Sequence, residues 1–351
     1  MIRVLLVDDS PIVLHILQRL LSRFPEIEVV GTAANGKEAL DLVQALNPDV
    51  ICTDLHMPVM DGLEFTRAVM NDYPRPILVV SVSVEPGSPN VFRMLEAGAV
   101  DVYPKPRDIL NGDMDKLANE LASKIRILAG VRVFRRRNNG RGAAASKPAV
   151  MPHPPVFFPR PQAPLRVVVI GASTGGPQAL REILARLPAN FPLPVLCVQH
   201  IGSTFLSEMV TWLAEVSPLP VRKAEHGETP QAGVVYFAPE DAHLELDDGV
   251  RFALSLAEPC DGHRPSVTIT MQAAARCFGA GTIGVLLTGM GRDGADGMAS
   301  IAAAGGITIA QDEASSTVYG MNKQAVELGA VQHILPLEQI APVLVELVRP
   351  L

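Results

Sequence analysis

The stretch Val167–Pro177, VVVIGASTGGP, joins a run of β-branched residues to a turn that contains three glycines and one serine. β-Branched apolar runs favour buried strands and proline is common in the first turn of a helix, so the stretch predicts a strand that turns sharply into a helix. Two chemistries suit such a turn. The glycines could let backbone amides surround a phosphate, or they could let Ser173 project as a nucleophile.

The residues around the turn favour the nucleophile. Gly171–Gly175 fits the G-x-S-x-G pattern of a serine exposed between a strand and a helix. A phosphate loop would continue with lysine and then serine or threonine, whereas Pro177 and Gln178 follow here. The next predicted strand ends in His200 rather than in the acid of a dinucleotide site. Because a short strand–helix–strand unit can bring Ser173 and His200 to one sheet edge, we expect a nucleophile and its general base.

The acid that orients such a base is expected after a third strand. Residues 282–298 predict a buried strand and a glycine-rich turn, with Asp293 at the start of the next helix. A carboxylate there can cap the helix, orient an imidazole, or do both. The chain order Ser173, His200, Asp293 differs from the serine, acid, histidine order of α/β-hydrolases, which would use His333 as the base. The residues alone leave the choice of histidine open.

The N-terminal part of the chain carries a second group of polar residues at predicted strand ends. Asp8 and Asp9 follow one strand, Asp54 follows another, and Ser81 and Lys105 close two later strands. Parallel strands bring such ends to one edge, where hard carboxylate oxygens suit Mg²⁺. A metal beside Asp54, with the Lys105 ammonium opposite, would stabilise a phosphoryl group in transfer. The alternative is that these acids only cap a helix or begin a loop.

Length and composition predict two domains and a linker. Short apolar runs alternate with amphipathic segments in residues 1–125 and again in residues 166–351, which is typical of parallel α/β domains. Residues 126–165 form the expected linker. From Phe134 to Pro164 the chain is rich in arginine, then alanine, then proline, without helical or strand periodicity.

Charge, hydropathy and cysteine usage argue against several classes of protein. The net charge of −7 is unlike that of a nucleic-acid-binding protein. The sequence shows neither an apolar run as long as a membrane span nor an N-terminal secretion signal. The four cysteines have neither metal-type nor disulfide-type spacing. From these observations we expect a cytoplasmic protein.

The first 120 residues resemble the receiver domain of bacterial two-component response regulators. The motifs that carry the resemblance are LLVDDS, DVICTDLHMPVMDGLEF, VVSVS and DVYPKP. The resemblance implies a flavodoxin-like, doubly wound five-stranded parallel sheet in which Asp54 accepts phosphate from a histidine kinase. It implies that Mg²⁺ is held by Asp8, Asp9, Asp54 and the backbone carbonyl of His56, and that Ser81 and Lys105 contact the phosphoryl group. A position often aromatic in receivers is Val102 here, and the adjacent Tyr103 is expected on the other face of its strand.

Residues 166–340 resemble the catalytic domain of the chemotaxis protein-glutamate methylesterases, so the whole chain is similar to the CheB family. The motifs are IGASTGGP, VQHI, GVVYFAPEDAHLEL, RPSV, VLLTGMGRDGADGM and IAQDEASSTVYGM. The resemblance implies a doubly wound α/β domain with a mostly parallel sheet and no cofactor for the esterase step. It implies Ser173 as nucleophile, His200 as base and Asp293 as its acid, with Thr174 and Met290 beside the site and helping to stabilise an oxyanion.

The implied substrate is a glutamyl methyl ester on a chemoreceptor, with deamidation of receptor glutamines as a second activity. Some positions depart from the family pattern. Ile201 and Gly202 follow the base where Met-Pro is common, Thr268 stands where an aspartate is usual, and Asn322 replaces a proline. We expect these departures to affect receptor docking rather than the triad.

Two other functions remain open. The receiver could control an output domain that only binds a partner, with the glycine-rich turn serving structure alone, or the second domain could be an esterase of small molecules.

Overall fold

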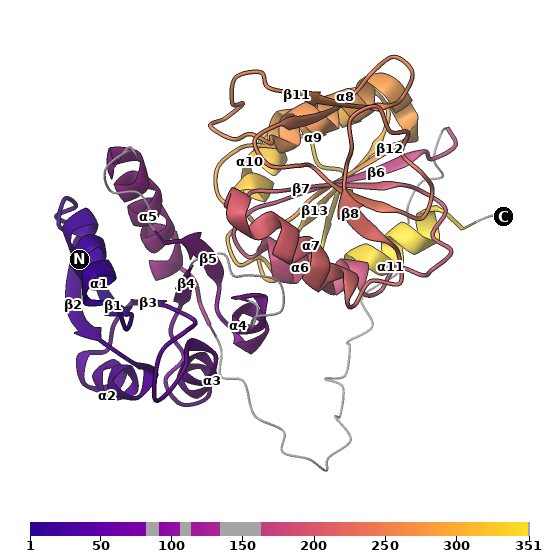
Figure 1. Ribbon diagram of the computed structural model, residues 1–351. Helices are drawn as coiled ribbons and strands as arrows, with labels where there is room; N and C mark the ends of the chain where they lie inside the picture. Colours follow the sequence, from indigo (N-terminus) through magenta and orange to yellow (C-terminus); the bar gives the residue numbers. More distant parts are fainter. Residues whose placement is uncertain (82–90, 106–113, 134–162, 350–351) are drawn as a thin grey trace, which may run out of the picture.

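The protein, as a computed structural model described over residues 1–81, 91–105, 114–133 and 163–349, consists of two α/β domains (Figure 1). Most of the expected linker, residues 134–162, lies outside these described residues. Among the helices of these described residues, none has the length and hydropathy of a transmembrane segment.

The N-terminal domain is built on a five-stranded sheet with the strand order β2-β1-β3-β4-β5, and all of its strand pairs are parallel. This is the flavodoxin-like order, so the expected fold of the domain is confirmed. The elements in chain order are β1 (Ile2–Val7), α1 (Pro11–Leu21), β2 (Ile27–Ala33), α2 (Gly36–Leu46), β3 (Val50–Thr53), α3 (Gly62–Asp72), β4 (Ile77–Ser81), α4 (Val91–Ala97), β5 (Asp101–Pro104) and α5 (Met114–Ala129).

Local sequence signals account for several boundaries in this domain. Ser10 caps α1 by accepting a hydrogen bond from the Val13 N–H, and Pro11 occupies the first turn. The central strands are buried along their length, as expected for a parallel sheet covered on both faces. Helix α5 continues to Ala129, so the domain boundary expected at residue 125 falls inside this helix.

The C-terminal domain has a seven-stranded sheet in the order β14-β13-β12-β6-β7-β9-β8, again with only parallel pairs, and a separate antiparallel hairpin of β10 and β11. The elements are β6 (Val167–Ala172), α6 (Gly176–Leu184), β7 (Val195–Gln199), α7 (Leu206–Ala214), β8 (Val221–Lys223), β9 (Val235–Phe237), β10 (His243–Leu246), β11 (Phe252–Ser255), α8 (Val267–Phe278), β12 (Thr282–Leu286), α9 (Ala295–Ala303), β13 (Ile307–Gln311), α10 (Met321–Glu327), β14 (His333–Leu335) and α11 (Leu337–Leu347).

The helices of this domain cover both faces of the sheet. Helices α8, α9 and α10 lie on one face, and α6, α7 and α11 lie on the other (Figure 1). Strand β6 lies between β12 and β7, and the order of strands reverses at β6 and β12. Ligands of open α/β sheets bind at the carboxyl ends of strands where the order reverses. The fold therefore places its site just after β6, β7 and β12.

Candidate active site

The turn after β6 is held tightly on both sides. The Ser173 N–H donates to the Thr288 carbonyl over 3.0 Å, and the Gly176 N–H donates back to the Ser173 carbonyl over 2.8 Å. Gly175 has a φ of +78°, and a Cβ there would lie 2.4 Å from Thr317 Oγ1. A side chain at this position would be strained by both its backbone conformation and the lack of space. The glycine thus permits the sharp turn that leaves Ser173 half-buried at the start of α6.

The base predicted from the sequence lies on the neighbouring strand end. Ala172 pairs with Gln199 between β6 and β7, and the His200 N–H donates to the Ala172 carbonyl over 3.0 Å. The Gln199 side chain donates to the carbonyls of both Ser173 and His200, over 2.8 and 2.9 Å. These hydrogen bonds fix the backbones that carry the hydroxyl and the imidazole relative to each other.

His200 contacts the predicted acid through its distal ring nitrogen. Nε2 lies 2.8 Å from Asp293 Oδ2, and only 8% of the His200 side chain is exposed. An ionised Asp293 makes Nε2 the protonated nitrogen and leaves Nδ1 as the acceptor. Nδ1 is buried and has no hydrogen-bond partner in the described structure. In the Ser-His-Asp template the acid holds Nδ1. Here Asp293 holds Nε2, so Nδ1 is the ring nitrogen left to accept a proton.

Asp293 is saturated with hydrogen bonds from the start of α8. Oδ1 accepts from Ser266 Oγ over 2.8 Å and from the Thr268 N–H over 2.9 Å, while Oδ2 accepts from the Val267 N–H as well as from His200. Burial opposes ionisation of Asp293. The hydrogen bond and charge of His200, together with the bonds from Thr268 and Ser266, outweigh it and hold the pKa of Asp293 well below its usual value.

The structure decides between the roles that the sequence left open for Asp293 and corrects the expectation for Thr268. Asp293 does not cap its own helix, because the N-cap of α9 is Gly294, and its carboxylate lies instead at the N-terminus of α8, where backbone N–H groups favour an anion. Thr268 was expected to leave the triad untouched, yet its N–H donates to Asp293 and its hydroxyl accepts the Gly294 N–H over 2.7 Å. Ser266 is the helix N-cap of α8, and a serine before an apolar helical run is a signal that could have identified it.

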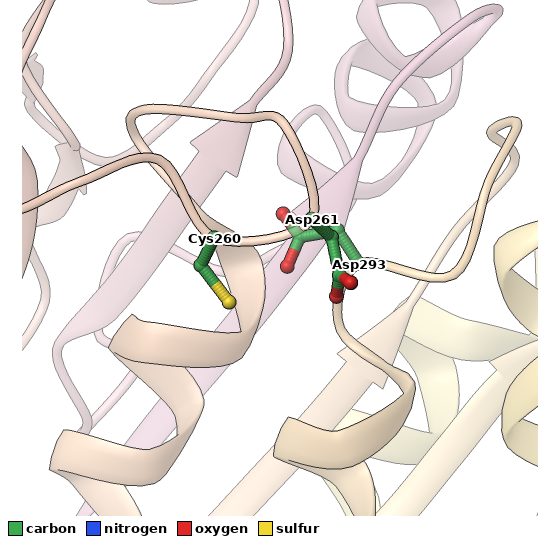
Figure 2. A group of neighbouring side chains, drawn as sticks. All are labelled: Cys260, Asp261 and Asp293. Carbon is green, nitrogen blue, oxygen red and sulfur yellow. The ribbon is translucent and has the colours of Figure 1, made fainter.

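Cys260 and Asp261 lie beside Asp293 and form with it a group whose ligand atoms are all within 4.8 Å of one another (Figure 2). A carboxylate has about four lone-pair positions, and those of Asp293 are occupied by the hydrogen bonds described above. Burial also raises the pKa of the Cys260 thiol, which disfavours the thiolate that binds metals. Asp293 in this group is therefore better suited to hold His200 by a hydrogen bond than to bind a metal ion.

The two residues expected near an oxyanion lie in different surroundings. Thr174 is buried, whereas 46% of the Met290 surface is exposed. Within the part of the chain that the structure describes, the backbone N–H groups of both residues donate no hydrogen bond. A Cβ on Gly289, the residue before Met290, would lie 2.7 Å from Ser173 Cβ. The absence of a side chain at Gly289 lets the Met290 backbone pass close to the serine.

The receiver residues predicted from the sequence also come together. Ligand atoms of Asp8, Asp9 and Asp54 lie within 4.8 Å of one another, and Lys105 Nζ lies 2.7 Å from both Asp54 Oδ2 and Asp8 Oδ2. Burial favours the neutral amine of Lys105, but the hydrogen bonds and charges of both acids raise its pKa above the usual value. Ser81 is buried at the end of β4.

The carboxylate cluster fits Mg²⁺. Asp8 Oδ2 is buried and, although close to Lys105, has no hydrogen bond of acceptable geometry. Burial raises the pKa of Asp8, and Asp54 adds to this, so a cation would relieve the cost of its charge. Asp9 and His56 are exposed. Val102 and Tyr103 belong to the hydrophobic clusters on opposite faces of the receiver sheet, as expected.

The receiver contacts the catalytic domain at the residue next to Ser173. Thr174 Oγ1 donates to Asp101 Oδ2 at the start of β5 over 3.0 Å, and Asp101 also pairs with Lys124 Nζ at 2.5 Å. Nearby, Gln178 Nε2 donates to the Ala99 carbonyl over 2.9 Å. No local pattern in the sequence predicts these contacts, because they join residues of two different domains.

A second group of contacts joins α4 to α6 and α7. Trp212 Nε1 donates to Glu96 Oε1 over 2.8 Å, and its ring stacks on Phe92 with centroids 5.2 Å apart. Arg181 pairs with the same Glu96 carboxylate at 2.9 Å. The apolar cluster of one receiver face continues through these residues into the catalytic domain. In the described arrangement the receiver therefore covers the surface beside the Ser173 turn.

The fold and these two clusters define a class: a receiver domain joined to an α/β domain that gathers serine, histidine and aspartate at one sheet edge. The CheB methylesterase family matches residues 168–344, and the response regulator receiver domain family matches residues 4–112. The chain belongs to the CheB methylesterase family.

Known proteins resemble both the whole chain and its second domain. A protein-glutamate methylesterase/protein-glutamine glutaminase of Nitrosospira multiformis is 42% identical over 349 residues, which cover 99% of this chain and 97% of that protein. A second protein of this kind, from Anaeromyxobacter dehalogenans, is 44% identical over 348 residues, with the same coverage. The crystal structure of the Thermotoga maritima CheB methylesterase catalytic domain shares 40% identity and a TM-score of 0.51, and covers 53% of this chain and 100% of that one.

The glycine turn provides a test of the site's construction. Gly175 and Gly227 have similar φ values of +78° and +81°, but only the first lacks room, since nothing lies within 4 Å of a Cβ at Gly227. We expect Gly227→Ala to cost about 1 kcal/mol of stability with normal activity. Gly175→Ala should cost about 2–3 kcal/mol and lower the hydrolytic rate at least about 10-fold.

Calorimetry of the catalytic-domain transition and an esterase assay measure the two effects. Equal losses in both variants would show that backbone strain alone, and not the Thr317 contact, governs this turn.

Proposed function

We propose that this chain is a protein-glutamate methylesterase that hydrolyses glutamyl methyl esters on chemoreceptors and deamidates receptor glutamines. The observation that carries the proposal is the 2.8 Å bond between His200 and a fully hydrogen-bonded Asp293, beside a serine on the adjacent strand end. Such a pair turns a weakly nucleophilic hydroxyl into a reactive one. The activity would serve adaptation in chemotaxis, in the cytoplasm, where the receptor's methylated segment and a histidine kinase would be the partners.

In the first chemical step Ser173 Oγ attacks the ester carbonyl while His200 Nδ1 takes its proton. Asp293 holds the ring through Nε2 and stabilises the imidazolium that forms. The imidazolium then gives its proton to the departing methoxide, and methanol leaves. In the second step a water molecule attacks the acyl-enzyme with the same histidine acting as base, which releases the glutamate and restores Ser173.

The oxyanion of both tetrahedral intermediates forms at the N-terminus of α6. Two features suit this stabilisation: the positive end of the α6 dipole, and the backbone N–H groups of Thr174 and Met290, which donate no hydrogen bond within the described residues. A glutamine amide forms a tetrahedral intermediate of the same kind and then the same acyl-enzyme, with ammonia leaving in place of methanol. The amide nitrogen is the poorer leaving group and depends more strongly on proton donation from His200. Deamidation is therefore expected at the same three residues.

Replacing the nucleophile Ser173 and the acid Asp293, which holds His200, tests the assignment of the triad. Ser173→Ala should lower methanol release from methylated receptor by about 10⁶-fold, and Asp293→Asn by about 10³- to 10⁴-fold, because the imidazole loses its orientation and tautomer. Asp296→Asn is the matched control, since this half-exposed carboxylate forms an ion pair with Arg292, four residues before it. It should stay within about twofold of the unaltered chain. Near-normal release by Ser173→Ala would contradict the mechanism.

The two rival functions are separated by substrate and by covalent labelling. A serine-directed fluorophosphonate should label Ser173, whereas the turn of a purely partner-binding domain would not react. An esterase of small molecules would hydrolyse small methyl esters as well as or better than methylated receptor.

The receiver is proposed to take phosphate on Asp54 from a histidine kinase. Mg²⁺ would be held by Asp8, Asp9, Asp54 and the backbone carbonyl of His56, and when bound it neutralises charge on the phosphoryl oxygens. Lys105 already lies against Asp54 and would follow the phosphoryl group, with Ser81 contributing a hydroxyl.

Phosphorylation is proposed to relieve an occlusion of the esterase site. The receiver contacts Thr174, directly beside the nucleophile, through Asp101. The strand β5 that begins with Asp101 leads directly to Lys105 at the phosphate site. A shift of Lys105 toward an Asp54 phosphate would therefore act on the same strand that contacts Thr174, and would shift the population toward an open arrangement.

Removing the receiver domain, or its contact with Thr174, tests this regulation. Deleting residues 1–140, or replacing Asp101 by alanine in the full chain, should raise basal methanol release, by about 10-fold if the closed form is favoured by about 1.4 kcal/mol. Asp54→Asn should keep the low basal rate and abolish stimulation by a small phosphodonor such as acetyl phosphate. Unchanged or lower activity of the deletion variant would rule out simple occlusion.

A further inference from the structure

A second imidazole lies flat against the proposed base. The ring centroids of His200 and His263 are 3.7 Å apart and the ring planes differ by 7°. Aromatic pairs prefer offset or edge-to-face arrangements with centroids about 4.5–7 Å apart. The near face-to-face contact is closer than attraction between the rings would favour, so the surrounding chain must impose it.

The segment that carries His263 is anchored on both sides of the ring. Before it, the backbones of Cys260 and His263 exchange two hydrogen bonds of 3.1 and 2.9 Å. After it, Ser266 donates its N–H to the buried ring of His243 over 3.2 Å and its hydroxyl to Asp293 over 2.8 Å. The same segment thus places one ring on His200 and supplies a hydrogen bond to the acid that holds His200.

A positioned base needs both of these constraints. The bond from Nε2 to Asp293 fixes one direction of the His200 ring, but χ2 of histidine is a soft torsion, and the ring could still tilt about that bond. A parallel ring in van der Waals contact removes this freedom. The buried Nδ1, which has no hydrogen-bond partner of its own, is then held in one direction.

We propose that His263 is a positioning residue for the base: its ring lies on that of His200, fixes the plane in which Nδ1 takes the Ser173 proton, and stabilises the resulting imidazolium. This inference rests on the proposed function and adds to it a residue outside the triad.

The charge state of His263 suits this role. Burial, with further contributions from His200 and from Lys124 of the receiver and against the opposing effect of Asp293, lowers the pKa of His263 to about 4. The ring is therefore neutral near pH 7, when His200 takes up its proton. A neutral π system beside a cation is attractive, whereas two stacked imidazolium ions would repel each other.

The sequence placed His263 in a polar loop and gave it no role. Its stacking on His200 depends on contacts of its segment with His243 and Asp293, which are distant from it in the sequence.

Two substitutions in the full-length chain test whether a flat ring at position 263 is what positions His200. His263→Ala removes the ring, His263→Phe keeps a flat neutral ring, and His226→Ala, at an exposed histidine of the same domain, is the control. We expect His263→Ala to lower kcat for methanol release about 10- to 100-fold with little change in KM. A misplaced base slows proton transfer from Ser173 but leaves substrate binding unchanged. His263→Phe should recover most of that loss, and His226→Ala should match the unaltered chain.

Two readouts do not depend on receptor turnover. The rate of fluorophosphonate labelling at Ser173 should fall in His263→Ala and recover in His263→Phe. The Cε1–H resonance of His200 should lie upfield in the unaltered chain, because it sits over a ring, move downfield in His263→Ala, and return in His263→Phe. If the alanine variant does not fold, kcat of His263→Phe near that of the unaltered chain supports the proposal.

Two results would overturn the proposal: His263→Ala with kcat and labelling rate equal to those of the unaltered chain, or a folded His263→Phe with kcat reduced to a level expected for loss of the ring. Failure of the proposed function is distinguishable, since the unaltered chain would then neither release methanol nor be labelled at Ser173.

Discussion

The organisation of the second domain depends on one buried carboxylate, Asp293. Its side chain is 1% exposed, and a charge there would be strongly disfavoured without partners. Every lone pair is used: the start of α8 supplies two backbone N–H groups and a hydroxyl, and His200 supplies its ring N–H. The negative charge is thereby kept in the interior and sets the tautomer of the histidine. The rest of the site is arranged around that histidine.

The sheet topology explains why residues so far apart in sequence can cooperate. Ser173 follows β6, His200 follows β7 and Asp293 follows β12, and these three strands are neighbours in the sheet. A parallel sheet aligns its carboxyl ends, so side chains that follow adjacent strands converge at one edge. The segment between β11 and α8 then completes the edge with His263 and Ser266, which no strand carries.

The receiver uses the same architectural rule for a different purpose. Asp8 and Asp54 follow the neighbouring strands β1 and β3, and Lys105 follows β5 at the same edge. Here the edge concentrates negative charge around one ammonium group instead of presenting a nucleophile. Strand β5 links the two chemistries. It ends next to Lys105 and begins with Asp101, whose carboxylate accepts a hydrogen bond from Thr174. A four-residue strand thus spans the distance between the phosphate site and the serine turn.

The sequence by itself determined the strands, the glycine turn and the polar residues at strand ends, because buried runs, glycine spacing and helix caps are local signals. These signals predicted both α/β domains, the carboxylate cluster around Asp54, and the candidates Ser173 and Asp293, whereas the choice of His200 over His333 came from the family resemblance. Only the tertiary structure decided which nitrogen of His200 meets Asp293, that Asp293 anchors α8 rather than its own helix, and that His263 and Asp101 lie at the site. These features come from contacts between segments distant in the chain, whose geometry is set by packing and leaves no periodic pattern in the sequence.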